Sequence, residues 1–378
     1  MLVSPMLLLI LLILFVYPFL LYAPILMLLA RMFAHKGSER SRDAESVALL
    51  ICALNEENII GQKIDNSLAL DYPREKLEII VISDGSTDAT AAVAQRYRSA
   101  GIRLIDQPKR RGKVKNLIEV VPTLKQDIVV FSDANVMYDP PAIKNLMKRF
   151  EDQSVGCVSG KVVLTDTTDP LNSGTSDYYS VEWALQENAS RLYSMMGADG
   201  AMYALRRELF QPPPPDTVIE DFVIPMAVIR QGRRVVFEPS ALGWEQGSLS
   251  LNEEFARKTR IGAGALQSLV RGNGWPGCVP ARVWFVFLSH KFLRWVSPIL
   301  GVMALFIACL SFDQKLSKLV LGGFLLLSVA AGLRMLLNQS HRAFDAPFYF
   351  LFGQIAAAIG LVKGLTGTQS VLWAKANR

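Results

Sequence analysis

Three short polar clusters stand directly after apolar runs, and their residue types suit a metal-chelated phosphate. Leu54-Asn-Glu-Glu57, Ser83-Asp-Gly-Ser-Thr-Asp88 and Ser132-Asp-Ala-Asn135 each follow a run rich in Val and Ile. Carboxylate and amide oxygens are the ligands that Mg²⁺ and Mn²⁺ prefer. The Asp-Gly-Ser-Thr-Asp run alone is equally typical of a turn into a capped helix. Its place beside the other carboxylates is therefore what indicates chemistry.

Alternating strand and helix patterns predict how these clusters are positioned. Strands are expected over Val47–Ala53, Leu77–Ser83, Ile102–Ile105 and Asp127–Ser132, and helices over Glu57–Leu70, Asp88–Ala100 and Lys113–Leu124. Such alternation predicts an α/β domain, placed at residues 45–280, with a mainly parallel sheet covered by helices on both faces. Ligands of such sheets bind at the carboxyl ends of the strands, where all three clusters fall.

A second pair of carboxylates, Glu220-Asp221, opens a predicted helix over Phe222–Gln231. Adjacent residues of a helix do not share a face, so the two carboxylates are expected to have different roles. A sugar transfer with inversion needs one carboxylate behind the anomeric carbon to take the proton of the acceptor hydroxyl. The alternative is an acidic pair that merely stabilises a helix N-terminus.

The composition indicates a membrane protein. Of 378 residues, 51% are hydrophobic, and the mean hydropathy is +0.26. The net charge of +6 is a mild excess that suits a membrane surface, and we expect no nucleic-acid partner. The four cysteines have neither zinc nor redox spacing, which is typical of a reducing compartment.

The amino-terminal residues 1–31 predict a retained transmembrane anchor. Met1–Ala30 carries no charged residue, and neither a basic leading region nor a small-residue cleavage site is present. Tyr17-Pro18 is a candidate kink. The basic residues that follow are Arg31, Lys36, Arg40 and Arg42. By the positive-inside rule, the next domain is expected on the cytoplasmic side of the cell membrane.

Residues 295–366 predict further transmembrane helices. Trp295–Phe312 and Leu319–Leu337 form a helical hairpin by pattern, whereas Phe348–Val362 is shorter and either spans a thin region or is re-entrant. Residues 281–294 predict an interfacial amphipathic helix, with a buried helix of the soluble domain as the alternative.

The basic tail, residues 367–378, creates a conflict in topology. Four full spans would place it outside, although its Lys and Arg residues favour the inside. One carboxy-terminal segment therefore need not cross the membrane.

In order and spacing, the motifs resemble those of the membrane-bound, inverting glycosyltransferases of family 2 that make exopolysaccharides, distantly similar to hyaluronan and cellulose synthases. The matching pieces are Asn55-Glu56-Glu57, Asp84-Gly-Ser-Thr-Asp88, Gly112-Lys113, Asp133-Ala-Asn135, Gly200-Ala-Met-Tyr-Ala-Leu-Arg206, Glu220-Asp221 and Arg257-Lys-Thr-Arg260. The resemblance covers nearly the whole chain and implies the GT-A fold, the fold of nucleotide-diphospho-sugar transferases.

The resemblance also implies roles for individual residues. Asp221 is the expected catalytic base; Asn55, Glu57, Asp84, Lys113, Asp133, Arg257 and Arg260 are expected to bind the donor; Gly200, Glu220 and Trp183 are expected on the acceptor side; Asp133 and Asn135 are the expected ligands of Mg²⁺ or Mn²⁺. The family usually has a second Asp where Asn135 stands, so the metal is expected to be held more weakly or chiefly by the diphosphate.

The segment Arg257–Arg260 departs from processive relatives, which carry Gln-x-x-Arg-Trp. Arg260 matches the arginine and could neutralise the leaving diphosphate, but Ile261 replaces the tryptophan that would stack on the acceptor sugar. This argues against a long glucan held there. The alternative is a basic helix face near lipid headgroups.

The leading hypothesis is therefore a membrane-bound transferase. It would take a sugar from a nucleotide-diphosphate donor, UDP-linked by preference, and add it to a glycan or polyprenyl-diphosphate-linked acceptor, with the lipid bilayer and proteins of a biosynthesis complex as partners. The alternatives are a processive polysaccharide synthase and a catalytically silent scaffold or transport subunit. A polyprenyl-phosphate sugar synthase would leave the motifs at Glu220-Asp221 and Arg257–Arg260 unexplained.

Overall fold

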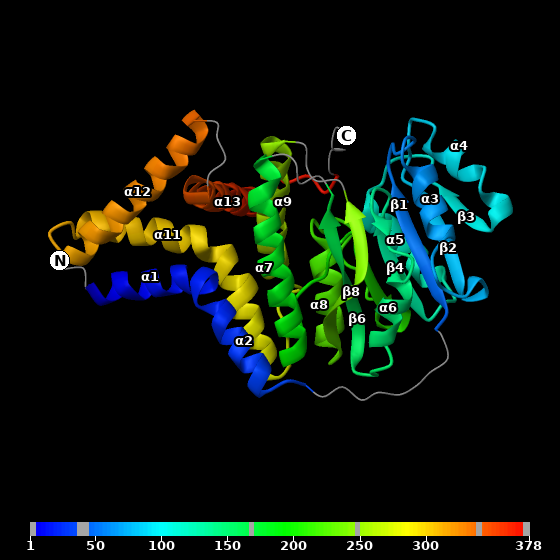
Figure 1. The fold of residues 1–378 in the computed structure, drawn as a ribbon, viewed down its shortest axis with the longest axis horizontal. Helices are drawn as coiled ribbons and strands as arrows, with labels where there is room; N and C mark the ends of the chain where they lie inside the picture. The colour runs from blue at the N-terminus through cyan, green and yellow to red at the C-terminus, as the bar shows by residue number, and fades with distance from the viewer. Residues whose placement is uncertain (1–4, 36–44, 166–169, 246–249, 338–341, 373–378) are drawn as a thin grey trace.

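The computed structural model describes residues 5–35, 45–165, 170–245, 250–337 and 342–372. Its central feature is an eight-stranded sheet with strand order β3-β2-β1-β4-β7-β6-β8-β5 (Figure 1). The strands are β1 Val47–Ala53, β2 Leu77–Ser83, β3 Ile102–Asp106, β4 Ile128–Asp133, β5 Met137–Tyr138, β6 Val155–Leu164, β7 Met202–Arg206 and β8 Arg234–Glu245. The first four strands pair in parallel and β7 is antiparallel to both of its neighbours, which confirms the predicted α/β class with a mainly parallel sheet.

The helices of this domain cover the sheet on both faces. They are α3 Ile60–Leu68, α4 Thr90–Gln95, α5 Lys113–Val120, α6 Ala142–Arg149, α7 Pro170–Leu192, α8 Glu220–Arg230 and α9 Leu251–Val270. Alternate residues of β1 point into two separate cores, Leu50 into one and Leu49 into the other. The helix predicted over Asp88–Ala100 is shorter in the structure. Helix α4 is followed by a 3₁₀ turn that ends at Gly101, whose φ is +82°.

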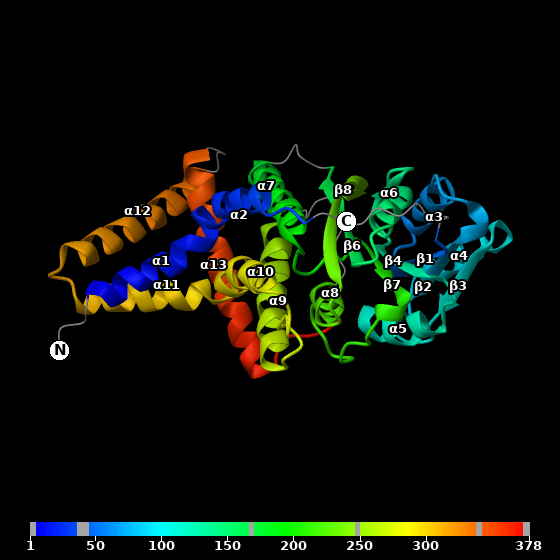
Figure 2. The same ribbon diagram turned by 90° about the horizontal axis from the view of Figure 1, so that it is seen from below.

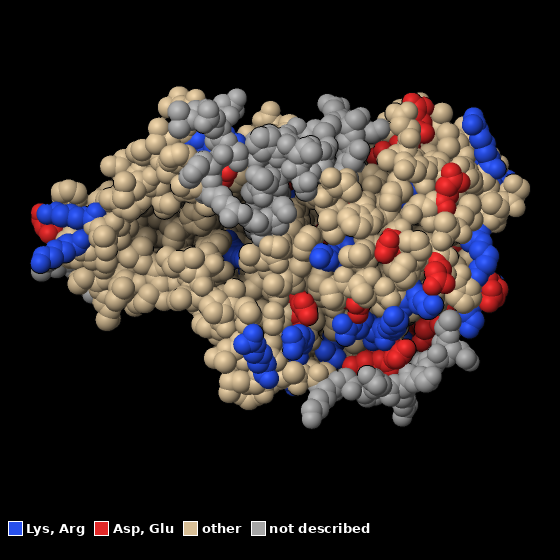
Figure 3. All heavy atoms as spheres, viewed as in Figure 1, with Lys and Arg blue, Asp and Glu red and all other residues tan. Residues whose placement is uncertain are grey.

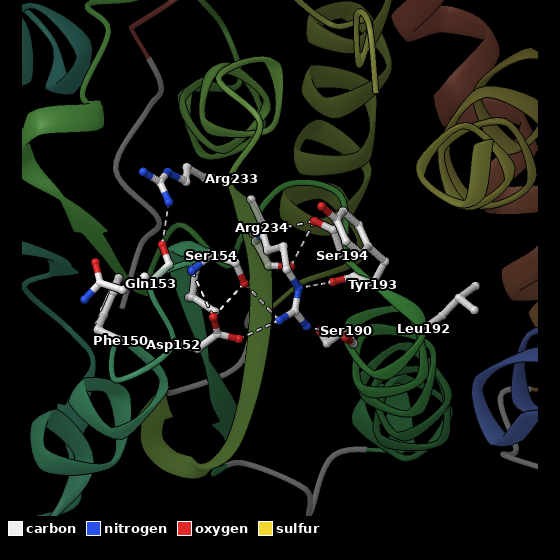
Figure 4. Close-up of polar contacts among 12 residues, drawn as sticks. Phe150, Asp152, Gln153, Ser154, Ser190, Leu192, Tyr193, Ser194, Arg233 and Arg234 are labelled. Carbon is white, nitrogen blue, oxygen red and sulfur yellow. Dashed lines mark hydrogen bonds and ion pairs between the residues drawn. The ribbon is translucent and has the colours of Figure 1, made fainter. Parts of the chain in front are cut away.

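A buried arginine ties α7 to the edge of the sheet (Figure 4). From β8, Arg234 donates from Nε to the carbonyl of Tyr193 at 2.6 Å and from Nη2 to the carbonyl of Ser190 at 3.1 Å. Its Nη1 lies 2.9 Å from Oδ2 of Asp152, which precedes β6. The hydrogen bonds to Ser190 and Tyr193 hold the end of α7 against β8, and the largely buried ion pair with Asp152 keeps the guanidinium in place.

The amino-terminal anchor is bent. Helix α1 Pro5–Leu20 and helix α2 Tyr22–Met32 meet at 62° directly after Pro18, where the sequence predicted a kink. The side chains of Tyr22, Leu26 and Ala30 are buried in one of the cores of the domain. The second half of the predicted anchor therefore packs on the globular domain instead of facing only lipid.

The carboxy-terminal helices are α10 Ala281–Val286, a π-helix Phe287–Phe292, α11 Leu293–Leu310, α12 Lys315–Leu337 and α13 Arg342–Thr366. Of these, α11 and α12 extend away from the sheet beside α1, whereas α13 runs across their direction beside α9 (Figure 2). Among the described residues, three helical stretches are long and apolar enough to cross a membrane: Ala281–Leu310, Lys315–Leu336 and Ala343–Thr366. The bent pair α1–α2 would make a fourth.

The segment predicted as an interfacial helix runs continuously into α11. Its residues Val283, Val286 and Phe287 are buried in the same core as α2. One face of this segment therefore packs on the globular domain, and its predicted position at a membrane interface stays a prediction.

Candidate active site

A pocket opens at the carboxyl ends of β1, β2 and β4, where the sequence placed the polar clusters. Its lining includes Asp84, Lys113, Asp133 and Asn135, four of the predicted site residues. They come from three different strand–helix connections. The parallel register of β1 with β2 and β4 brings these connections to one edge of the sheet.

Asp84 organises the loop that covers the pocket. Its carboxylate accepts hydrogen bonds from the backbone N–H groups of Arg111 and Gly112, both at 2.8 Å, and from Nδ2 of Asn116 at 2.9 Å. Gly85 is required here by its φ of +65° and because an added Cβ would lie 2.2 Å from the backbone nitrogen of Arg110. The loop before α5 is thus held closely over the end of β2.

Asn55 and Glu57 lie beside the pocket and are not among its lining residues. Asn55 Oδ1 accepts the N–H of Thr87 at 2.8 Å, and Glu57 Oε2 accepts that of Ala89 at 2.9 Å. Both side chains therefore stabilise the loop between β2 and α4. Their predicted contact with a donor stays a prediction.

Lys113 is the electrostatic centre of the site. Its Nζ lies 2.7 Å from Oδ1 of Asp133 and 3.5 Å from Oε1 of Glu220, and it donates to the carbonyl of Gly200 at 3.0 Å. Burial by itself would lower the pKa of Lys113, but the carboxylates of Asp133 and Glu220 raise it above its usual range. The lysine therefore stays charged and joins three elements that are distant in sequence.

Glu220 continues this line of alternating charges. Only 7% of its side chain is exposed, and its Oε2 lies 3.8 Å from Nη2 of Arg260, which also donates to the carbonyl of Val218 at 2.7 Å. Predicted on the acceptor side, Glu220 lies between the two cations Lys113 and Arg260. Asp133, Lys113, Glu220 and Arg260 thus form a continuous chain of opposite charges across the site.

Asp221 points in another direction, towards Gly200. An added Cβ on Gly200 would lie 3.0 Å from Asp221 Oδ2, so the carboxylate packs closely against this glycine. Desolvation by the surrounding protein, together with the negative charge of Glu220, raises the pKa of Asp221 to about 6. A carboxylate with this pKa is ionised near neutral pH and is a better proton acceptor than an ordinary aspartate.

Asp199 was not among the predicted site residues. Desolvation and the nearby carboxylates of Glu245 and Asp221 raise its pKa to about 7, while a hydrogen bond from the N–H of Ala201 opposes the shift. Asp199 stands immediately before the recognised motif that begins at Gly200. An Asp-Gly pair is so common in turns that it carried no separate signal.

The two predicted metal ligands lie on the same pocket wall, and a further carboxylate adjoins them. Asn135 Nδ2 donates to Oε1 of Glu245 at 2.8 Å, which leaves the amide oxygen, on the other branch of the Asn135 side chain, as the atom that could bind a cation. Glu245 ends β8 and was missed because its approach to Asn135 depends on sheet pairing. Among the described residues, no group of three His, Cys, Asp or Glu side chains is arranged to hold a metal.

Arg257 and Trp183 lie outside the pocket lining. Arg257 forms a two-pronged ion pair with Glu254 on the same helix, with both N–O distances at 2.9 Å. Trp183, on α7, packs beneath the ammonium of Lys161, which lies 4.3 Å from its ring centroid. The donor role predicted for Arg257 and the acceptor role predicted for Trp183 stay predictions.

Comparisons with known proteins agree with this geometry. A family model described as "Glycosyltransferase like family 2" matches residues 44–264, more than half of the chain. Poly-beta-1,6-N-acetyl-D-glucosamine synthase of Staphylococcus aureus (strain MSSA476) is 24% identical over 235 residues, which are 61% of this chain and 57% of that protein. Probable glycosyltransferase YdaM of Bacillus subtilis (strain 168) is 25% identical over 240 residues, with the same coverage. These matches thus span less than two thirds of the relatives' length.

One solved structure matches almost the whole chain. The mannosyltransferase PcManGT from Pyrobaculum calidifontis, in complex with GDP-Man and Mn²⁺, aligns with a TM-score of 0.73 at 21% identity and covers 96% of this chain and 100% of that one. At this identity, the likeness shows the fold alone.

The chain belongs to glycosyltransferase family 2 and has the GT-A fold. The predicted family, fold and enzyme class are therefore confirmed, and membership supports a transferase over a silent scaffold.

Proposed function

We propose that the protein transfers a sugar, with inversion, from a nucleotide-diphosphate donor to a glycan or polyprenyl-diphosphate-linked acceptor at the cytoplasmic face of a membrane. A UDP-sugar is the preferred donor. The observation that carries this proposal is the raised-pKa carboxylate of Asp221 beside the charge chain from Asp133 to Arg260. Such a group of residues could accept a proton and neutralise the charge of a leaving diphosphate.

The residues present fit a divalent cation that is bound partly by the protein and partly by the diphosphate of the donor. Asp133 and Asn135 supply one carboxylate and one amide oxygen on the same wall, and the diphosphate and water would complete a coordination shell of oxygens. The solved relative PcManGT contains Mn²⁺. The metal, Mg²⁺ or Mn²⁺, would offset the negative charge of the diphosphate, and Lys113 and Arg260 would add to this effect.

Asp221 would then act on the acceptor. Its carboxylate lies beside Gly200, in the first turn of α8 and next to Glu220 of the charge chain. It would take the proton of the acceptor hydroxyl while the nucleotide leaves from the opposite side of the sugar ring.

A second candidate is a processive polymerase. The printed name of the Staphylococcus aureus relatives, a poly-N-acetylglucosamine synthase, favours it. The exposed Ile261, where processive enzymes have a stacking tryptophan, favours single addition.

The size of the product tests both candidates. Purified protein in lipid would be incubated with radiolabelled UDP- and GDP-sugars, Mg²⁺ or Mn²⁺, and a total lipid extract as acceptor. We expect a short, lipid-soluble product from one donor. A high-molecular-weight product would replace single addition by polymerisation, and the absence of both turnover and UDP binding would contradict the proposed function.

The pH profile of turnover tests the role of Asp221. Because only the ionised carboxylate accepts a proton and its pKa is raised to about 6, we expect kcat to be level above pH 7 and to fall about tenfold per pH unit below pH 6. With an aspartate of ordinary pKa as the base, the fall in kcat would begin near pH 4 instead. Asp199 titrates nearby, so the profile of Asp199→Asn is the control, and the limb near pH 6 should persist in it.

Replacing Asn135 with Asp should strengthen metal binding. The added carboxylate supplies charge that the amide lacks, and we expect about tenfold less Mn²⁺ to be needed for the same UDP-dependent thermal stabilisation. The exposed Asn252→Asp, on α9, is the matched control and should leave the Mn²⁺ requirement unchanged. An unaltered requirement in Asn135→Asp would remove residue 135 from the metal site.

A further inference from the structure

Helix α13 has the length and composition of a membrane span, but its contacts place both of its ends on the same side of the membrane. At 25 residues, it is about 37 Å long, enough to cross the hydrocarbon core of a bilayer. A helix that crosses the membrane would have one end beside the catalytic domain and the other end at the opposite membrane surface. Helix α13 instead contacts, from start to finish, parts of the molecule that lie towards the catalytic domain.

The first half of α13 meets the ends of the spanning helices that lie nearest the domain. Asp345 forms a buried ion pair with Arg334 near the C-terminal end of α12. Phe350 packs edge-on against Phe19, near the end of α1, with ring centroids 5.2 Å apart. In the middle of the helix, Gln354 Oε1 accepts a hydrogen bond from Ser297, near the start of α11, at 3.0 Å.

The second half of α13 packs on the catalytic domain itself. Its glycines allow close contact with α9, since an added Cβ on Gly360 would lie 2.4 Å from the carbonyl of Thr259 and one on Gly364 would lie 2.8 Å from that of Ala263. Beyond the helix, Leu372 reaches the active-site pocket, where it joins the lining with Asp84 and Lys113. Both ends of α13 therefore lie on the catalytic side.

The outer face of α13 is apolar. Ile355, Ile359, Val362 and Leu365 are 39–74% exposed, and their spacing of three and four residues puts them on one face, opposite the glycines. On α12 the exposed residues include the neighbours Leu325 and Leu326, which cannot share a face, as expected for a helix surrounded by lipid. The two helices thus present different surfaces.

The pictures agree with these contacts. In Figures 1 and 2, α1, α11 and α12 run side by side away from the sheet, whereas α13 runs across their direction beside α9. In Figure 3, Lys, Arg, Asp and Glu are sparse along the spanning helices and reappear at their far end, where α11 and α12 are joined. This distribution fits a bilayer around α1, α11 and α12, with its near boundary at α13.

We propose that α13 does not cross the membrane but lies in its plane, with the face of Ile355, Ile359, Val362 and Leu365 in the boundary between lipid headgroups and acyl chains. The occupant of this face is lipid, because the face adjoins the lipid-exposed helices α11 and α12. The chain then crosses three times, through α1, α11 and α12. The residues that follow α13, as far as Leu372, lie on the catalytic side, so α13 is the carboxy-terminal segment that need not cross the membrane. This proposal does not depend on which sugar is transferred.

Spin-label depth measurements test the proposal. Nitroxides would be placed by cysteine substitution at the four exposed α13 positions in a variant whose native cysteines are replaced, in phosphatidylcholine–phosphatidylglycerol vesicles. We expect all four labels at one depth, within about 5 Å, near the headgroup boundary. Labels at Leu319, Leu326 and Leu336 of α12 are the matched control and should spread over about 25 Å.

Two results would overturn the proposal. A depth that changes by about 1.5 Å per residue along α13 would show a spanning helix. Full accessibility of all four labels to a water-soluble relaxation agent would show that lipid does not cover this face.

The side of the tail gives an independent measurement. An impermeant maleimide added to sealed vesicles should label Ser370→Cys together with the catalytic-domain variant Lys115→Cys, and from the side opposite to Asp313→Cys at the turn between α11 and α12. If Ser370→Cys is labelled from the same side as Asp313→Cys, α13 crosses and the proposal fails.

Discussion

Replacing Asp221 with Asn is expected to lower turnover by about 100-fold or more while donor affinity stays near the wild-type value. The amide keeps the shape of the side chain in the space beside Gly200 but cannot accept the proton of the acceptor hydroxyl. The charge chain through Lys113, Glu220 and Arg260 does not include Asp221, so it should remain intact. Single-turnover sugar transfer and equilibrium UDP binding measure the two quantities separately.

The control for Asp221→Asn is Asp216→Asn. Asp216 is paired with Arg271 at the surface, outside the pocket lining, so its loss should change neither turnover nor UDP binding appreciably. If Asp221→Asn lost binding and turnover equally, the residue would be structural or would hold the metal, and the proposed base would be wrong.

Replacing Lys113 with Met is expected to affect both stability and binding. The ammonium separates Asp133 from the buried Glu220, so its removal leaves two carboxylates without this cation in a poorly solvated site. Breaking such a buried pair costs about 3 kcal/mol of unfolding free energy. The loss of the charged contact that we propose between Lys113 and the diphosphate should also weaken UDP binding about tenfold or more. Denaturant unfolding and UDP titration measure these effects.

Two further variants make this test specific. Lys115→Met, on the exposed face of the same helix, should change the unfolding free energy by less than about 0.5 kcal/mol. Lys113→Met combined with Glu220→Gln removes one of the two carboxylates left without this cation, and should recover part of the stability but not the UDP binding. Equal stability of Lys113→Met and the wild type would contradict the central place of Lys113 in the charge chain.

Much of the fold could be predicted because its signals are local. The β-rich runs over β1 and β2 have the same bounds in the structure, since buried parallel strands read as short continuous apolar segments. Helix ends were predicted less well, as at α4, because the last turns depend on which tertiary contacts replace the helical hydrogen bonds.

The candidate site could be predicted only in part. Asp84, Lys113 and Asp133 share one pocket, as expected from their places at strand ends. The sequence did not predict that Glu245 adjoins Asn135 or that Asp199 lies near Asp221, because these approaches depend on antiparallel strands that join late in the chain. It also did not predict that the side chains of Asn55 and Glu57 would accept hydrogen bonds from the loop between β2 and α4.

By itself, the sequence determined the α/β class, the apolar ends and the order of the motifs, because periodicity and composition are properties of consecutive residues. Only the tertiary structure decided how far the carboxylate of Asp221 is removed from water, and hence why its pKa is raised. It also decided the contacts of α13, since hydropathy measures how apolar a helix is but not what each of its faces touches. The role of Gly360 and Gly364, which is to let α9 pack closely against α13, is visible only in the structure.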